Sequence, residues 1–192
     1  IADGDYNSLE DPYLNSGKIF INEYFNNNTT FNNSSMLSIN GGTLRNYGGL
    51  VNNGTLINNN GTLSNYSTLS SNDTLNNKGT LNNYSTLNNN GVIDNSKNSL
   101  GFNGFINKGT YTGNGAILGS WTDHGTVKPG NSAGGMLIDG YYYKKGGSTE
   151  IELGGTYDGD GDRTATEHDW IEITGNLELA GKLNVLLIHD FE

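Results

Sequence analysis

Residues 42–59 read GTLRNYGGLVNNGTLINN, which is a six-residue unit, Gly-Thr-Leu-x-Asn-y, written three times with small changes. The unit returns over 61–78 as GTLSNYSTLSSNDTLNNK and over 79–96 as GTLNNYSTLNNNGVIDNS. Tyr47 ends the first hexad, and the same position is Tyr66 and then Tyr84 after steps of 19 and 18 residues. A fixed period of this size is typical of stacked coils. Three hexads per period predict a roughly triangular coil.

The hexad also predicts which side chains face inward. Side chains on a strand alternate between its two faces, and six is an even number, so every hexad keeps the same phase. If the leucine points inward, the asparagine two residues later also points inward, whereas the threonine points outward. The inward apolar positions are Leu44, Leu50, Leu56, Leu63, Leu69, Leu75, Leu81, Leu87 and Ile93. The one seven-residue step among them, from Leu56 to Leu63, indicates that Asn60 is inserted at a turn.

Stacking is what makes such a coil stable. One large apolar residue per hexad is too little for an isolated hairpin, but each leucine gains about 1.5–3 kcal/mol if coils above and below bury it. Asn46, Asn65 and Asn83 share one corner and are expected to form a ladder of amide hydrogen bonds between coils. Glycine allows the positive φ angles that tight corners need.

The sequence therefore predicts an all-β, single-stranded parallel β-helix, or solenoid, with about three short strands in each coil of 18–19 residues. We expect the coil to be right-handed. The alternative is an antiparallel meander, because several Asn-Gly dipeptides would suit hairpin turns. A meander gives no reason for Tyr and Ser-Thr-Leu to recur at every third unit, so we favour the solenoid.

The pattern divides the chain into three parts. Residues 1–16 lack the repeat and are predicted to be an irregular lead-in, 17–134 form the Asn/Gly-rich hexad solenoid, and 135–192 form wider coils or a cap with longer strands. In the degenerate hexads the inward grid is expected to continue through Phe31, Leu37, Leu100, Ile106, Tyr111 and Ile117. The longer strands are predicted over Met136–Tyr143, Ser148–Leu153, Trp170–Thr174, Asn176–Leu179 and Lys182–Ile188.

Composition excludes several classes of function. The net charge is −10, and 12 of the 20 acidic residues lie from Asp139 onward, so we expect no nucleic-acid partner and no binding to an anionic membrane. The chain has no cysteine, which rules out disulfides, zinc fingers and thiol nucleophiles. No apolar run is long enough to cross a membrane. The chain begins at Ile1 without methionine and ends beside an apolar strand, so we expect it to be a piece of a longer protein.

Three segments carry a likeness to a known family. GTVKPGNSAGGMLIDGYYY (125–143), STEIELGG (148–155) and HDWIEITGNLELAGKLNVLL (168–187), in this order, resemble the C-terminal β-helix of bacterial autotransporter passengers and related secreted adhesin-like proteins. The resemblance implies a right-handed parallel β-helix, export to the bacterial cell surface, and a role as a stalk or adhesive module. Expected partners are cell-surface or matrix glycans. Independently of the resemblance, the open ends of a solenoid present unpaired backbone, so self-association through these ends is also expected. The family pattern supplies no catalytic residues.

The corner tyrosines are the first candidate site. Tyr47, Tyr66 and Tyr84 should stack on one outward corner at the coil rise of about 4.8 Å, where they could form an aromatic strip for sugar rings. The alternative is mutual stacking that only stabilises the rod. Asn65 and Asn83 also begin Asn-x-Ser triplets, which would invite glycans in a eukaryotic secretory pathway.

An acidic segment is the second candidate. Asp158, Asp160 and Asp162 alternate, and Asp169 follows 11 residues after Asp158, which is similar to a calcium-binding EF-hand loop. Arg163 occupies the position where that loop needs glycine, and the flanking segments are predicted strands rather than helices. The alternative is an acidic, solvated hairpin loop without a cofactor.

Two further functions are weighed against the structural role. Ranks of outward threonines, Thr43/Thr62/Thr80 and Thr68/Thr86, could order water as an ice-binding surface, although threonine also simply favours strands. A polysaccharide lyase or hydrolase would need paired carboxylates on one face, and coils 42–97 hold only Asp73 and Asp94, at different places in their coils. The sequence therefore predicts a non-enzymatic structural or adhesive module.

Overall fold

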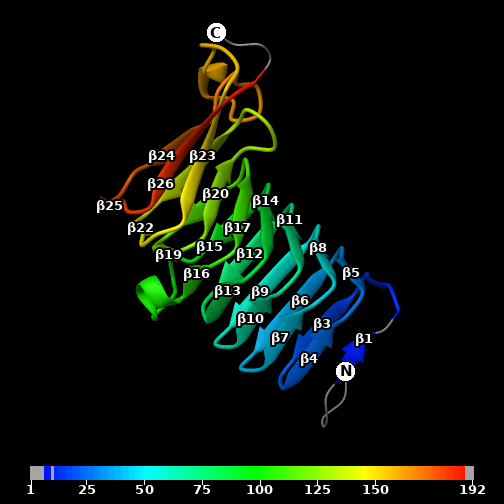
Figure 1. Ribbon diagram of the computed structural model, residues 1–192. Coiled ribbons are helices and arrows are strands. Elements are labelled where there is room, and N and C mark those ends of the chain that lie inside the picture. The colour runs from blue at the N-terminus through cyan, green and yellow to red at the C-terminus, as the bar shows by residue number, and fades with distance from the viewer. Residues whose placement is uncertain (1–6, 10, 189–192) are drawn as a thin grey trace.

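A computed structural model of the chain describes residues 7–9 and 11–188, which form a rod of stacked β-coils (Figure 1). The strands belong to three sheets of nine, nine and eight strands, and every pairing between named strands is parallel. Each sheet takes every third strand along the chain. This confirms the predicted parallel β-solenoid and excludes the meander, whose neighbouring strands would run antiparallel.

The three sheets are the three sides of the coil. Sheet A contains β1 (Asn7–Leu9), β4 (Tyr24–Asn27), β7 (Thr43–Asn46), β10 (Thr62–Asn65), β13 (Thr80–Asn83), β16 (Phe105–Asn107), β19 (Trp121–Asp123), β22 (Tyr142–Lys144) and β25 (Leu177–Glu178). Sheet B contains β2 (Tyr13–Asn15), β5 (Thr30–Asn33), β8 (Gly49–Asn52), β11 (Thr68–Ser71), β14 (Thr86–Asn89), β17 (Thr110–Gly113), β20 (Thr126–Pro129), β23 (Ser148–Leu153) and β26 (Lys182–Leu187). Sheet C contains β3 (Lys18–Ile21), β6 (Met36–Asn40), β9 (Thr55–Asn59), β12 (Thr74–Asn77), β15 (Val92–Asp94), β18 (Ala116–Leu118), β21 (Gly135–Asp139) and β24 (Trp170–Ile173).

The strand register places equivalent residues on top of one another. Leu63 pairs with Leu44 of the preceding coil and with Leu81 of the next. All three side chains point into the rod and are at most 1% exposed. Each leucine thus realises the burial energy of about 1.5–3 kcal/mol that a single coil could not supply. The predicted in/out phase of the hexads is confirmed.

The predicted asparagine ladder is present and longer than expected. Along the corner that follows sheet A, each Nδ2 donates to the Oδ1 of the next coil at 2.7–2.8 Å. The members of this ladder are Asn27, Asn46, Asn65, Asn83 and Asn107. Shorter ladders at the other two corners join Asn15 to Asn33 and Asn52, and Asn58 to Asn77 and Asn95.

Two steps between inward positions are seven residues long, Leu37 to Leu44 and Leu56 to Leu63, and both place their extra residue at the same corner of the coil. Asn60 follows β9 with φ 57°, and Gly41 follows β6 of the preceding coil with φ 76°. An isolated bridge joins Asn40 to Asn60, so the two extra residues lie in neighbouring coils. Asparagine and glycine are the residues that adopt a positive φ most readily, which confirms Asn60 as a turn insertion.

Two predictions in the flanking coils are wrong. The lead-in predicted over 1–16 already contains β1 and β2, which begin sheets A and B. Leu100 is 47% exposed and precedes a short 3-10 helix, η1 (Gly101–Asn103). Because this excursion shifts the phase, Phe105 rather than Ile106 takes the inward place and pairs with Leu81.

The C-terminal strands continue the same three sheets. The predicted strand over Met136–Tyr143 is in fact two strands, β21 and β22, which belong to sheets C and A. β23 and β26 are six residues long and pair along their whole length. Residues 135–188 are therefore longer coils of the same rod rather than a separate cap (Figure 1).

Aromatic rings replace the leucines inside these later coils. Trp121 stacks between Phe105 and Tyr142 with centroid separations of 5.1 and 5.0 Å. Tyr142 is 1% exposed and is the interior member of the Tyr141–Tyr143 run, as alternation along a strand requires.

Replacing one ladder rung tests the corner hydrogen bonds. Asn65 Nδ2 donates to Asn83 Oδ1 and to the Thr86 carbonyl, both at 2.8 Å. We expect Asn65→Ala to lower the free energy of unfolding by about 2–4 kcal/mol, because it leaves buried polar groups without partners. Asn82→Ala, one residue before the next rung on the outward face, should change it by less than about 0.5 kcal/mol. Urea denaturation followed by circular dichroism measures both, and equal losses would contradict the ladder's role.

Candidate functional site

The three corner tyrosines lie directly after sheet A strands and stack as the sequence predicts. The rings of Tyr47 and Tyr66 are 5.0 Å apart at an interplanar angle of 11°, and those of Tyr66 and Tyr84 are 4.9 Å apart at 4°. Their exposed fractions are 48%, 43% and 40%. The strip is thus a real surface feature that follows the long axis of the rod.

The stack covers the ring faces. Neighbouring rings face one another, and Lys108 Nζ lies 5.2 Å from the Tyr84 ring centroid as a cation–π contact. An aromatic ring offers its apolar contact area mainly through its faces, whereas this strip presents ring edges. The geometry favours mutual stabilisation, and the sugar-binding assignment of Tyr47, Tyr66 and Tyr84 stays a prediction.

The Asn-x-Ser triplets at this corner are not open to glycans. Asn65 and Asn83 are 0% exposed, and their amides donate within the ladder. Modification of either amide would require the corner to open. The sequence pattern therefore marks a buried rung rather than a glycosylation site.

The acidic segment forms a loop between β23 and β24 with its own internal hydrogen bonds. Asp158 Oδ1 accepts from the Asp160 amide, and Asp162 Oδ1 accepts from the Thr164 amide and hydroxyl. The bonds from Thr164 hold the pKa of the exposed Asp162 carboxyl below its usual value. Glu167 and Gly154 close the base of the loop through a backbone hydrogen bond of 2.7 Å. These contacts hold the loop together from within, and calcium binding by Asp158, Asp160, Asp162 and Asp169 stays a prediction.

Asp169 differs from the other three aspartates, because its carboxylate binds backbone amides outside the acidic loop. Its Oδ1 accepts from the Gly134 amide at 2.8 Å and its Oδ2 from the Glu152 amide at 2.9 Å. The residue is 6% exposed, and burial raises the pKa of its carboxyl to about 6. Asp169 therefore ties β23 and the start of β21 to β24. Within the part of the chain that the structure describes, no three His, Asp or Glu side chains gather as a metal site would require.

A groove beside Asp169 was not predicted. It has a volume of about 470 Å³ and is lined by Lys128, Glu150, Glu152 and Asp169, among others. Lys128 and Glu150 form an ion pair of 2.5 Å. Glu152 Oε2 is buried without a hydrogen-bond partner among the described residues, and its charge adds to the rise in the Asp169 pKa. Glu152 lies on β23 and Asp169 directly precedes β24, and the irregular loop between these consecutive strands hid the pair from spacing along the sequence.

The outward threonines lie in register as predicted. Thr62 pairs with Thr43 and Thr80 on sheet A. On sheet B the hydroxyl rank is longer than the sequence suggested, because Thr68 and Thr86 continue into Thr110, Thr126 and Ser148. On sheet A the neighbouring outward rank changes from Arg45 to Ser64 and Asn82, which breaks the uniform surface that ice would require. Ice binding stays a prediction.

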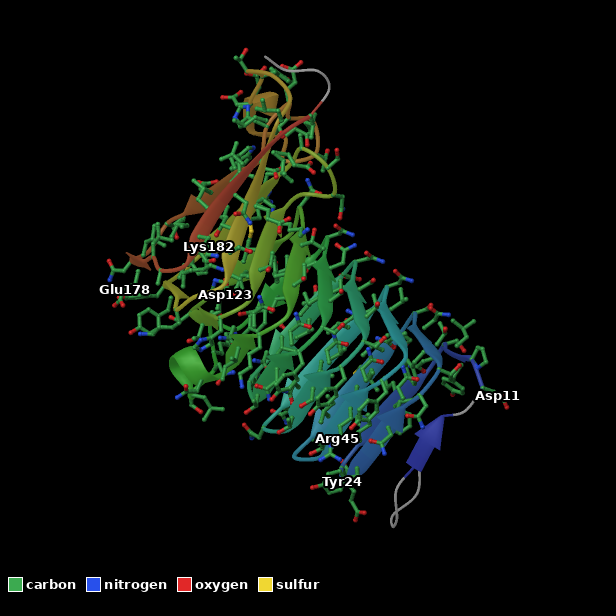
Figure 2. The ribbon with its side chains drawn as sticks, in the orientation of Figure 1. Asp11, Tyr24, Arg45, Asp123, Glu178 and Lys182 are labelled. Atoms are coloured by element: carbon green, nitrogen blue, oxygen red, sulfur yellow. The ribbon has the colours of Figure 1, made fainter. Side chains whose placement is uncertain are left out.

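A buried ion pair ends the long asparagine ladder, and the sequence did not predict it. Asn107 Nδ2 donates to Asp123 Oδ1 at 2.7 Å, while Lys144 Nζ and the Tyr142 hydroxyl donate to Oδ2 at 2.5 and 3.0 Å. Lys144 also donates to the Gly125 and Ser148 carbonyls. Asp123 belongs to the later coils (Figure 2), and the side chains of Asp123 and Lys144 are at most 1% exposed.

The geometry defines the chain as a parallel β-solenoid protein. No protein-family model, curated protein or solved structure matches it. The described residues include no helix that is long and apolar enough to span a membrane. The likeness to autotransporter passengers therefore stays a prediction from the segments that carry it.

Removing one member of the ion pair tests how the ladder ends. We expect Lys144→Met to destabilise the protein by about 3–5 kcal/mol, because it leaves the Asp123 carboxylate buried and uncompensated. The double variant Asp123→Asn/Lys144→Met should recover most of this loss, since an asparagine at 123 continues the ladder without a charge. Urea denaturation of both variants measures the difference. A double variant no more stable than Lys144→Met would contradict the assignment.

The raised pKa of Asp169 predicts a pH dependence of stability. The folded carboxyl has a pKa of about 6 against an ordinary 3.8, so the folded state holds more protons between these values. Stability should therefore fall as pH rises from about 4 to about 6 and then level off. Asp169→Asn removes this titration. We expect the melting temperature of the native chain minus that of the variant to decrease over this interval, and a flat difference would contradict the prediction.

Proposed function

We propose that this protein is a non-enzymatic structural β-solenoid module, a rod within a larger secreted or cell-surface protein. The observation that supports this most is its continuous interior. One cluster of buried apolar side chains extends from Ile19 to Tyr142 without a break, flanked by the corner ladders. Repeat proteins of this kind gain stability from each neighbouring pair of coils. Such a rod holds its two ends at a fixed separation.

We place the rod outside a bacterial cell. The proposal rests on the likeness of residues 125–143, 148–155 and 168–187 to secreted adhesin-like β-helices. The acidic charge of −10 fits a protein that avoids anionic membranes and nucleic acids. Labelling of intact source cells by an antibody against the domain supports this location, whereas labelling only after lysis opposes it.

The catalytic alternative has little support from the geometry. A glycoside hydrolase holds two carboxyl groups across an open cleft. Asp73 directly precedes β12 and Asp94 lies on β15, in neighbouring coils and at different positions of their hexads. Glu152 and Asp169 are neighbours, but both oxygens of Asp169 accept hydrogen bonds from backbone amides, that of Gly134 in the preceding coil and that of Glu152. Because the Asp169 carboxylate is engaged in the fold, the Glu152–Asp169 pair lacks a second carboxyl group that is free to take part in catalysis.

A panel of polysaccharides and matrix glycans tests the proposal. We expect the 192-residue chain to cleave none of them and to show no binding that depends on the tyrosine strip, with or without calcium. The matched variant is Tyr66→Ala/Tyr84→Ala, checked by circular dichroism for retained β-structure. Glycan binding by the native chain that this folded variant loses would make the strip adhesive and overturn the passive rod. Cleavage of any polysaccharide would overturn the non-enzymatic role.

A further inference from the structure

The corner between sheets A and B changes its chemistry halfway along the rod. Each residue there directly follows a position of the long asparagine ladder. In successive coils these exposed corner residues are Tyr47, Tyr66 and Tyr84, and then Lys108, His124 and Lys145. The ladder positions before the last three pair in register with those of the neighbouring coils. Lys108, His124 and Lys145, here called the basic row, therefore follow one another at the coil rise of about 4.8 Å.

Aromatic rings hold both ammonium groups of the basic row. Lys108 Nζ lies 5.2 Å from the Tyr84 ring centroid, close to the 4.9 Å that separates the rings of Tyr66 and Tyr84, so this ammonium group takes the place of a fourth ring. Lys145 Nζ lies 3.3 Å from the ring centroid of Tyr143. These cation–π contacts order two long side chains in advance, which lowers the entropy that they lose when a ligand binds.

The charges of the basic row are not neutralised within the protein. No ion pair among the described residues includes a member of the row, and the acid next to it in the sequence, Asp123, is buried against Lys144. Glu178 on β25 accepts a hydrogen bond from the Tyr141 hydroxyl. The acidic loop lies at the far end of β23, which has six residues and is therefore about 20 Å long. Exposed charges further apart than about 8 Å are largely screened at physiological ionic strength, so the row is locally positive although the chain carries −10.

We propose that the basic row binds a linear acidic polysaccharide that lies along the axis of the rod. Cationic side chains at steps of about 4.8 Å suit a polymer whose acidic groups repeat with its sugar units, because an extended pyranose chain advances by a similar distance per unit. Lys108 and Lys145 supply ammonium groups to carboxylate or sulfate groups, and His124 supplies a ring N–H between them. This inference goes beyond the structural role of the rod, which stands if no polysaccharide binds.

The narrowness of the basic row favours a polysaccharide over other polyanions. The row is one side chain wide and follows a single corner of the coil. Proteins that bind nucleic acid present a broader basic face, which neutralises many phosphates at once. An anionic membrane is a plane, and it likewise attracts clusters of several Lys and Arg residues. A single flexible chain with one acidic group per unit can follow a row of this width.

Isothermal titration calorimetry of the 192-residue chain with polygalacturonate, heparin and neutral dextran tests the binding. We expect both acidic polymers to bind, more weakly at high salt, and dextran not to bind. Lys108→Gln/Lys145→Gln should raise the dissociation constant by about tenfold. Lys78→Gln/Lys97→Gln is the matched control, because it removes the same charge from exposed lysines between sheets C and A, and it should change the constant less than about threefold. Equal losses in the two variants, or no binding of either acidic polymer, would overturn the proposal.

A charge in the middle of the basic row tests its geometry. His124→Glu places a carboxylate between the two ammonium groups and should abolish detectable binding of polygalacturonate. Asn53→Glu adds the same charge at an exposed asparagine after β8 and should leave binding nearly unchanged. The Tyr66→Ala/Tyr84→Ala variant keeps the whole basic row and should retain binding, which separates this site from the tyrosine strip. Circular dichroism checks that each variant keeps its β-structure. Binding that survives His124→Glu, or single-stranded RNA that binds more tightly than polygalacturonate, would contradict the assignment.

Discussion

The corner amides are the constraint on which this rod depends. At each corner the backbone leaves its sheet, and the carbonyls there need donors inside the structure. Asn46 Nδ2 supplies one hydrogen to the Thr68 carbonyl and the other to Asn65 Oδ1. Because both hydrogens point toward the next coil, the oxygen must face the preceding one. The ladder therefore has one direction, and it continues only as long as an asparagine returns at the same place in the next coil.

A directional ladder has two unlike ends, and this explains features that look unrelated. At its start an oxygen lacks a donor, as in Asn27 and Asn58 within the described residues. At its far end an amide needs another acceptor. Asn107 donates to Asp123 and Asn95 to the Ser120 carbonyl. The third ladder stops at Asn52, which donates to the Thr74 carbonyl, because Ser71 occupies the next rung. Asp123 is charged and buried, so it requires a cation. Lys144 occupies the next rung and donates to the corner carbonyls as an asparagine would.

The middle of the rod was predictable from the length of its repeat. A hexad has an even number of residues, so it preserves the inward and outward phase of the strand, and three hexads place Leu63 over Leu44. The phase failed at Phe105, since the excursion at η1 changes the count in a way that composition does not reveal. The position of the tyrosine strip was predictable. The stacking of its rings was predictable too, because a coil rise of about 4.8 Å brings neighbouring rings into contact. The pairs Asp123–Lys144 and Glu152–Asp169 were not predictable, because both lie outside the regular hexads. The first joins two coils, and the second joins the two ends of the irregular loop between β23 and β24.

The end of the asparagine ladders coincides with a change in how the interior is packed. Beyond Asn89 the rungs of one corner are Gly113 and Pro129, which carry no amide side chain. The later coils therefore depend on aromatic and aliphatic packing, with Trp121 and Tyr142 in place of leucine. An amide at the end of a ladder needs a specific acceptor, whereas stacked rings need only apolar contact. The interior therefore changes along the rod from leucines flanked by amide ladders to stacked aromatic rings.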